Sequence, residues 1–310
     1  MAPGEDTSYI DGATLKFGVP ARKPVRAAAG ASQLAFPGFI YNGGPVIASP
    51  LVYTSFWGAL WSDAAHQAAA QRLSQYLQDL LKSNFMNILS QYGVGTGAGS
   101  GQFGQASFVA NVPSQVADTD IQNIIQSNIN AGVLPEPSAN SNSLGLMIFL
   151  DEDTEVNDPD LGVVMCEPQG DTAFGYHNGF TTAAGNPFYY SVVPALDDAC
   201  LENSCGGDSG CTLQLSQTQE QRRTQVASHE FAEMVTDPVP PTGWYDQTDP
   251  NSDEIGDICN GQSDTITVGP NTWTVQSIYS STDDQQSGGS NYCLSQVITP
   301  EALLPGAPQP

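Results

Sequence analysis

Three runs of hydrophobic residues along the chain predict buried β-strands. Each run is rich in β-branched, aromatic or leucine side chains and is bounded by polar or turn-forming residues. A run without polar alternation is typical of a strand covered on both faces of its sheet. The predicted strands span residues 46–57, 144–150 and 188–193.

Other segments place hydrophobic residues at steps of three and four, which is the period of a helix with one buried face. Leu73 and Leu77 follow this period, and so do Ile121 and Ile125. Polar residues suited to the N-cap precede each segment. The predicted helices follow Ser62 or Asp63 up to Leu81, run from Asp118 or Asp120 to Gly132, and run from Ser216 or Thr218 to Thr236.

The order of these elements indicates the fold class. Strands and helices alternate over the first two-thirds of the chain, which favours an α/β fold, with a mixed α+β arrangement as the alternative. We predict a single domain over residues 39–298, with a mixed sheet, a long helix and disulfide-bonded loops. We also predict that residues 1–38 form an extended N-terminal segment and that residues 299–310 form a Pro-rich tail.

The composition is strongly acidic. Asp and Glu number 33 against 8 Lys and Arg, and the formal net charge is -25. Nucleic-acid affinity comes largely from basic residues that neutralise phosphates, and anionic lipid surfaces attract the same residues. The charge therefore excludes nucleic acid and membrane surfaces as partners. No apolar run approaches the ~18 residues that a membrane-spanning helix needs.

The cysteines indicate an oxidising compartment. Six of them lie in the second half of the chain, an even number that fits three disulfides, and their spacings lack the C-x2-C steps of most structural zinc sites. Because disulfides persist outside the cytoplasm, we predict a secreted, extracellular protein. Residues 1–6 show no signal peptide, so we infer that one has been removed. A cytosolic protein with free thiols is the alternative.

The last predicted helix carries a metal-binding pattern. His229 and Glu233 are four residues apart, so they lie on one helix face and can reach one cation. An imidazole and a carboxylate suit zinc, and Glu230 occupies the place of the general base in metalloprotease helices of the H-E-x-x-H type. Here Glu233 replaces the second histidine. Its negative charge makes the metal a weaker Lewis acid, so the pattern supports metal binding more strongly than catalysis.

Segments around this helix form a further signature. Residues 227–238 read ASHEFAEMVTDP, residues 243–245 read GWY, and residues 254–261 read EIGDICNG. Together they resemble the phosphate-induced, EXORDIUM-like family, and looser similarities extend over most of residues 40–295. The resemblance implies an extracellular protein with a site around the helix. The H-E-x-x-E helix is itself similar to the metal-site helix of zincin peptidases, so the domain is expected to be zincin-like.

The neighbourhood of these motifs supplies candidates for the other site residues. The third metal ligand is predicted to be Asp257, His177 or Glu254, followed by Asp237. A tyrosine could donate a hydrogen bond to the oxyanion that forms during hydrolysis. The candidates for that role are Tyr176 and Tyr245. The choice among them depends on geometry, which spacing along the chain does not supply.

These features predict a secreted zinc-dependent metallohydrolase, similar to peptidases, in which Glu230 activates a metal-bound water. A peptide is the expected substrate, and a cell-wall-derived or small-molecule substrate is the alternative. A different class of function is a non-enzymatic extracellular binding or signalling protein with a structural zinc or calcium ion. Calcium needs six to eight oxygen ligands, several of which residues 246–257 could supply. A third alternative is a zincin-like fold that has lost its metal.

Overall fold

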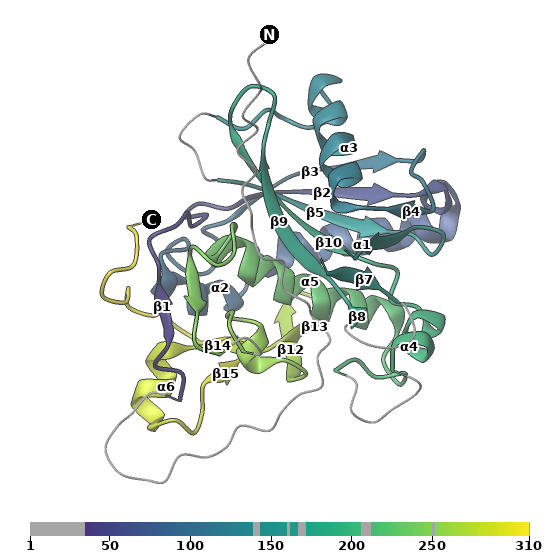
Figure 1. The fold of residues 1–310 in the computed structure, drawn as a ribbon. Helices are drawn as coiled ribbons and strands as arrows, with labels where there is room; N and C mark the ends of the chain where they lie inside the picture. Colours follow the sequence, from purple (N-terminus) through teal and green to yellow (C-terminus); the bar gives the residue numbers. More distant parts are fainter. Residues whose placement is uncertain are drawn as a thin grey trace.

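The computed structural model describes residues 35–138, 143–159, 162–166, 172–205, 212–249 and 252–309. Within these residues, a five-stranded sheet lies at the centre with helices on both of its faces (Figure 1). Apart from residues 35–38, the predicted N-terminal segment lies outside the described residues.

The central sheet is mixed. Its strand order is β3-β2-β5-β10-β9, in which neighbouring strands are parallel except for the edge strand β9, which runs antiparallel to β10. This sheet and its alternation with helices confirm the predicted mixed-sheet α/β fold class. The strands are β2 (Leu51–Trp57), β3 (Gln102–Val109), β5 (Leu144–Leu150), β9 (Tyr176–Thr181) and β10 (Pro187–Val193).

Two of the three predicted strands match β5 and β10. The third, predicted over residues 46–57, begins only at Leu51. The backbone before Leu51 lies instead against the end of the long helix α5 (Gln219–Thr236), where the N–H of Ile47 donates a hydrogen bond to the carbonyl of Val235 at 2.9 Å. The first residues of this hydrophobic run therefore contact a helix, and the later ones form a strand. The hydrophobic pattern alone does not show where the strand begins.

Alternate side chains of β5 divide the core into two parts. Leu146 and Ile148 pack with α3 (Asp118–Asn130), whereas Met147 and Phe149 pack on the opposite face, which carries α1 (Ala64–Leu80) and α5. Burying one such side chain stabilises the fold by about 1.5–3 kcal/mol. The unbroken hydrophobic run of β5 is thus explained by burial on both faces, as predicted.

Polar caps define where the helices begin. The side chain of Asp63 accepts a hydrogen bond from the N–H of His66 at the start of α1 (Ala64–Leu80). Thr218 forms a capping box with Gln221 at the start of α5. Each cap satisfies backbone N–H groups that the first helical turn leaves without partners. Both caps are among the predicted positions.

Smaller elements surround this framework. β1 pairs with β11, β12 with β13, and β14 with β15, while β4, β6, β7 and β8 form a four-stranded sheet. The strands are β1 (Phe39–Tyr41), β4 (Gln115–Val116), β6 (Glu155–Asp158), β7 (Val163–Met165), β8 (Thr172–Ala173), β11 (Trp244–Asp246), β12 (Ser263–Val268), β13 (Asn271–Gln276), β14 (Ile278–Tyr279) and β15 (Cys293–Leu294). The helices are α2 (Phe85–Leu89), α4 (Asp198–Cys205) and α6 (Ser281–Ser287), with 3-10 turns η1 (Ala59–Ser62), η2 (Ser90–Tyr92) and η3 (Asp257–Cys259).

The described cysteines are oxidised, as predicted. One disulfide joins Cys166 to Cys200, another joins Cys259 to Cys293, and Cys205 is disulfide-bonded as well. The Pro-rich tail lies along α2 and η2, where the N–H of Leu304 donates to the carbonyl of Gln91. The disulfides thus link segments within the second half of the chain, and the tail contacts connect its end to α2 and η2.

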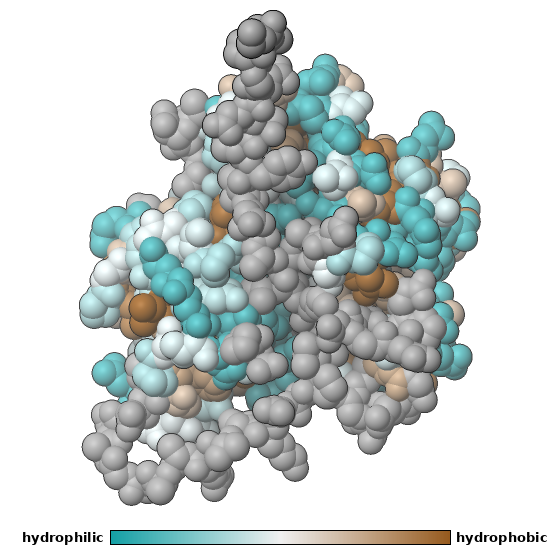
Figure 2. Space-filling model, in the orientation of Figure 1, coloured by the Kyte–Doolittle hydropathy of each residue, from teal (hydrophilic) through white to brown (hydrophobic). Residues whose placement is uncertain are grey.

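The surface agrees with the acidic, polar composition. On the face drawn in Figure 2, the described residues are mainly hydrophilic, and hydrophobic side chains occur in small separate groups. None of the helices in the described part of the chain is long and apolar enough to span a membrane.

Candidate metal centre

The C-terminal half of α5 brings three of the predicted site residues together. His229, Glu230 and Glu233 are each at most 2% exposed. The helix is buried between the central sheet and the hairpin of β12 and β13, so its polar side chains face other elements of the protein. Phe231 and Ala232 pack in the hydrophobic core. A helix in this position can hold charged groups away from bulk water.

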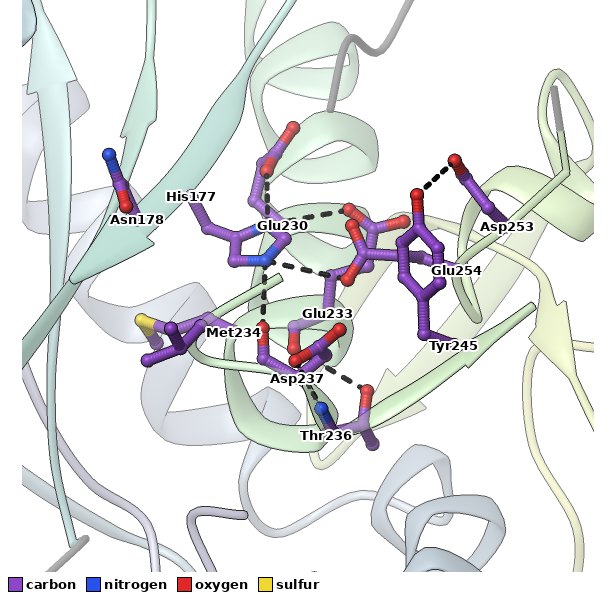
Figure 3. A network of polar contacts seen from close by, with 12 residues as sticks. His177, Asn178, Glu230, Glu233, Met234, Thr236, Asp237, Tyr245, Asp253 and Glu254 are labelled. Atoms are coloured by element: carbon purple, nitrogen blue, oxygen red, sulfur yellow. Dashed lines mark hydrogen bonds and ion pairs between the residues drawn. The ribbon is translucent and has the colours of Figure 1, made fainter. Parts of the chain in front are cut away.

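The edge strand β9 adds His177 to this cluster (Figure 3). Nδ1 of His177 lies 3.6 Å from Glu230 Oε2 and 3.6 Å from Glu233 Oε2. Nε2 of the same ring lies 3.1 Å from the carbonyl oxygen of Asp237 and 3.5 Å from Glu254 Oε1. The imidazole therefore lies among four acidic residues, three of which contribute side-chain oxygens.

After α5 and β9, the loop that leads into η3 forms the third side of the cluster. It contributes Glu254 and Asp257. Asp257 Oδ1 lies 3.7 Å from His229 Nε2. The disulfide between Cys259 and Cys293 fastens the end of this loop to β15. The structure thus brings all five predicted metal-ligand candidates into one place.

The ligand atoms fall into two groups that could each hold a metal ion. One group is His229, Glu233 and Asp257, and the other is His177, Glu230 and Glu233. Within each group the ligand atoms lie within 4.8 Å of one another. In the first group, His229 Nε2 is 3.0 Å from Glu233 Oε1. Both groups are buried and combine one imidazole with two carboxylates.

The cluster concentrates negative charge in the interior. Six carboxylates are at most 9% exposed: Glu230, Glu233, Asp237, Asp253, Glu254 and Asp257. In the described part of the chain, the ion pairs that these groups form involve histidines alone. Both carboxylate oxygens of Glu230 and of Glu254 have no hydrogen bond. A buried charge without a partner is costly, and a bound cation removes that cost.

The pKa values indicate how the cluster shares protons without a cation. Burial alone would lower the pKa of His177, but Glu230 and Glu233 outweigh it and raise the pKa to about 10. Burial raises the pKa of Glu254 and of Asp257 well above the usual value, and neighbouring carboxylates add to the effect. The cluster therefore holds extra protons, which a metal ion would displace on binding.

Two residues that shape the first ligand group were not predicted. The amide N–H of Gln276 donates to His229 Nδ1 at 2.7 Å, so the neutral ring carries its proton on Nε2, which faces Glu233. A metal ion binds Nε2 only when that proton moves to Nδ1 and the Gln276 amide turns its oxygen toward it. Gly256 leaves room for both ligands, since an added Cβ would lie 2.6 Å from His229 Nδ1 and 2.7 Å from Glu233 Oε1. The glycine stands in the E-I-G-D segment, which was a usable signal. No sequence pattern links Gln276 to the helix.

Gly256→Ala is expected to weaken metal binding by about 10–100-fold, the range typical of changes to groups that support ligands. The φ of Gly256 is -80°, which alanine also adopts, so the effect comes from the methyl group pressing on His229 and Glu233. Competition with a chromogenic zinc chelator measures it. Gly101→Ala is the control, because the three atoms nearest to its methyl would all belong to the side chain of Leu81, outside the cluster. Equal affinities of the two variants would contradict this account.

The two predicted oxyanion donors differ in position. The hydroxyl of Tyr176 donates to Asp118 Oδ1 at 2.8 Å, in the core beside α3. The prediction for Tyr176 is therefore wrong, because adjacent residues of a strand point to opposite faces and His177 takes the face toward the cluster. Tyr245 does lie beside the cluster, but its hydroxyl donates to Asp253 Oδ2 at 2.6 Å (Figure 3).

A groove of about 680 Å³ lies elsewhere, between α1 and the edge strand β3. Gln67, Gln71 and Phe108 are among the residues that line it, and none of the lining residues has an ionisable side chain. The groove therefore offers space without ligands or acid-base groups. The candidate metal ligands lie in the buried cluster instead.

The resemblance of residues 227–238 and 254–261 to the EXORDIUM-like family stays a prediction from those motifs, and so does the relation to zincins. Comparison of the chain with models of protein families, with curated proteins and with solved structures gives no match.

Proposed function

We propose that the protein is a secreted zinc-dependent hydrolase that acts on peptides. The observation that carries this proposal is the convergence of His229, Glu233 and Asp257 beside Glu230, whose carboxylate oxygens have no hydrogen bond. Three protein ligands leave one position of a tetrahedral zinc ion open, which is the arrangement of catalytic rather than structural zinc sites.

The chemistry of the ligands favours zinc over calcium. Each ligand group contains an imidazole nitrogen, whereas calcium takes oxygen ligands in larger number. Two nearby acidic residues accept hydrogen bonds from neighbouring groups. Asp246 Oδ1 accepts hydrogen bonds from Thr248, and Asp253 accepts one from Tyr245.

The residues of the chain have distinct roles in the proposed reaction. When bound, zinc supplies Lewis acidity that polarises the substrate carbonyl and makes water more acidic. Glu230 takes up the proton of the attacking water and returns it to the leaving group. Burial raises the pKa of Glu230, which brings its basicity closer to that needed at neutral pH. Gln276 keeps the ring of His229 in its orientation.

A second candidate is a non-enzymatic extracellular protein with a structural metal. The burial of the cluster favours it, since His229, Glu230 and Glu233 are at most 2% exposed and a substrate needs access. Disulfide bonds support an extracellular location for either candidate.

Metal content and peptide cleavage, measured together, distinguish these candidates. The full chain, purified in the presence of zinc and dialysed, is expected to retain zinc and to cleave a mixture of peptides, with new termini read by mass spectrometry. A chelator should abolish cleavage. Protein without zinc overturns the proposal, and zinc-loaded protein that cleaves neither peptides nor cell-wall fragments supports the structural-metal alternative.

A further inference from the structure

We propose that the cluster holds a second divalent cation, between His177, Glu230 and the oxygen of Glu233 that faces away from His229. Glu233 places Oε1 3.0 Å from His229 Nε2 and Oε2 3.6 Å from His177 Nδ1. Because one carboxylate can coordinate through both of its oxygens, Glu233 can serve one ion on each side. The remaining ligands of the two ions are separate residues.

The orientation of His177 is that of a metal ligand. Its Nε2 lies 3.1 Å from the carbonyl oxygen of Asp237, and a carbonyl only accepts, so the ring donates from Nε2. In the neutral ring, Nδ1 then carries a lone pair, which faces the carboxylates of Glu230 and Glu233. In the metal-free protein a proton on Nδ1 supplies the positive charge between these groups, and a cation can take its place. Donation of the other ring N–H to a backbone carbonyl is the usual support for a ligating histidine.

The distances at His177 fit a coordinated ion better than a shared proton. A separation of 3.6 Å from Nδ1 to each carboxylate is too long for a hydrogen bond. Two ligands bound to one zinc ion at 2.0–2.2 Å, at the tetrahedral angle, lie about 3.3–3.6 Å apart. Nδ1 of His177 and both oxygens of Glu230 have no hydrogen bond, although both residues are only 1% exposed.

The charge of the cluster accommodates two cations. Two divalent ions would offset four of the six buried carboxylate charges, so the second ion would not meet an excess of positive charge. The ligand set of one imidazole and two carboxylates suits zinc at this position too. Asp257 and His229 are not part of it.

Occupancy of the second position changes the role of Glu230. The proposed reaction uses a lone pair of Glu230 to accept a proton, and coordination to a cation engages that carboxylate instead. Excess zinc is therefore expected to inhibit the hydrolysis that one equivalent supports. This consequence rests on the proposed function, whereas the binding of a second ion does not.

Titration of the metal-free full chain with zinc tests the second position. Calorimetry, followed by metal analysis after removal of free zinc, should give two equivalents for the wild type. His177→Ala and Asp257→Asn should each bind one equivalent, because each loses one ligand group. His66→Ala is the matched control and should keep two, since His66 pairs with Asp63 and Glu152 outside the cluster.

The outcomes separate this inference from the proposed function. A wild-type protein that saturates at one equivalent overturns the second position and leaves the first intact. An absence of bound zinc overturns both proposals. His177→Gln, which keeps a polar side chain of similar reach, provides a second test if circular dichroism shows that His177→Ala does not fold. Two equivalents in a folded His177→Gln protein also overturn the inference.

Discussion

Glu230→Gln is expected to retain zinc at the first ligand group and to reduce peptide hydrolysis by about 10²–10⁴-fold, the range by which general bases contribute to catalysis. The amide has the shape of the carboxylate but cannot accept the proton. Glu230 is not a member of the group formed by His229, Glu233 and Asp257. The loss should therefore fall on kcat rather than on KM.

A matched control separates this role from a general effect of charge. Glu202→Gln makes the same substitution at an exposed position of α4 and should leave kcat unchanged. Full activity of the Glu230 variant would place the base elsewhere. Loss of zinc from that variant at one equivalent would instead make Glu230 a ligand of the essential metal.

Removal of the metal is expected to lower the melting temperature by about 10 °C at pH 8. A ligand present at about 1,000 times its Kd stabilises the folded state by ~4 kcal/mol, and each kcal/mol corresponds to about 2–4 °C for a chain approaching this size. Thermal denaturation with and without a chelator measures the change. Zinc should restore the melting temperature and magnesium should not, because magnesium prefers oxygen ligands and retains its water.

The effect of metal removal should depend on pH in a defined direction. Burial raises the pKa of Asp237 from 3.8 to about 7 in the metal-free protein. A raised acidic pKa means that the folded state favours the protonated form, so its stability declines as pH rises from about 4 to 7, by on the order of 4 kcal/mol. The pKa of His177 is raised to about 10, and the stability that it contributes is lost as pH rises above 6.5.

Both groups therefore make the metal-free protein less stable at pH 8 than at pH 5. A bound cation takes the place of the proton on His177, and its charge lowers the pKa of the nearby Asp237, so the dependence on pH becomes weaker. The drop in melting temperature on chelation should thus be larger at pH 8 than at pH 5. Equal drops at the two values would show that the cluster does not exchange protons for metal.

Local patterns in the sequence predicted much of the framework. The unbroken run of β5 and the N-caps Asp63 and Thr218 each act over a few residues, and the structure places elements where these signals predict them. The strand β9 was not predicted, because it is short and mixes polar residues with a glycine. Its polar groups are buried only because distant partners satisfy them, as Asp118 does for Tyr176 and Asn178.

In the candidate site, too, local spacing could be predicted from the sequence, whereas long-range contacts could not. The spacing of His229 and Glu233 on one helix decided their proximity, since four residues make about one helical turn. The approach of His177 and Asp257 depends on how a sheet edge and a loop pack against that helix, which no local pattern encodes. Gln276 comes from a hairpin that packs on α5, and its role depends on the same long-range contact.

The disulfide between Cys259 and Cys293 has a consequence for the conditions under which the protein can work. It closes the loop that presents Glu254 and Asp257 to the helix, so one wall of the cluster is held by a covalent bond as well as by packing. Reduction of that bond would remove one of the restraints on the loop that carries Asp257, a carboxylate of the first ligand group. If the cluster binds a metal ion as proposed, its retention depends in part on this disulfide, and we expect reducing conditions to weaken it.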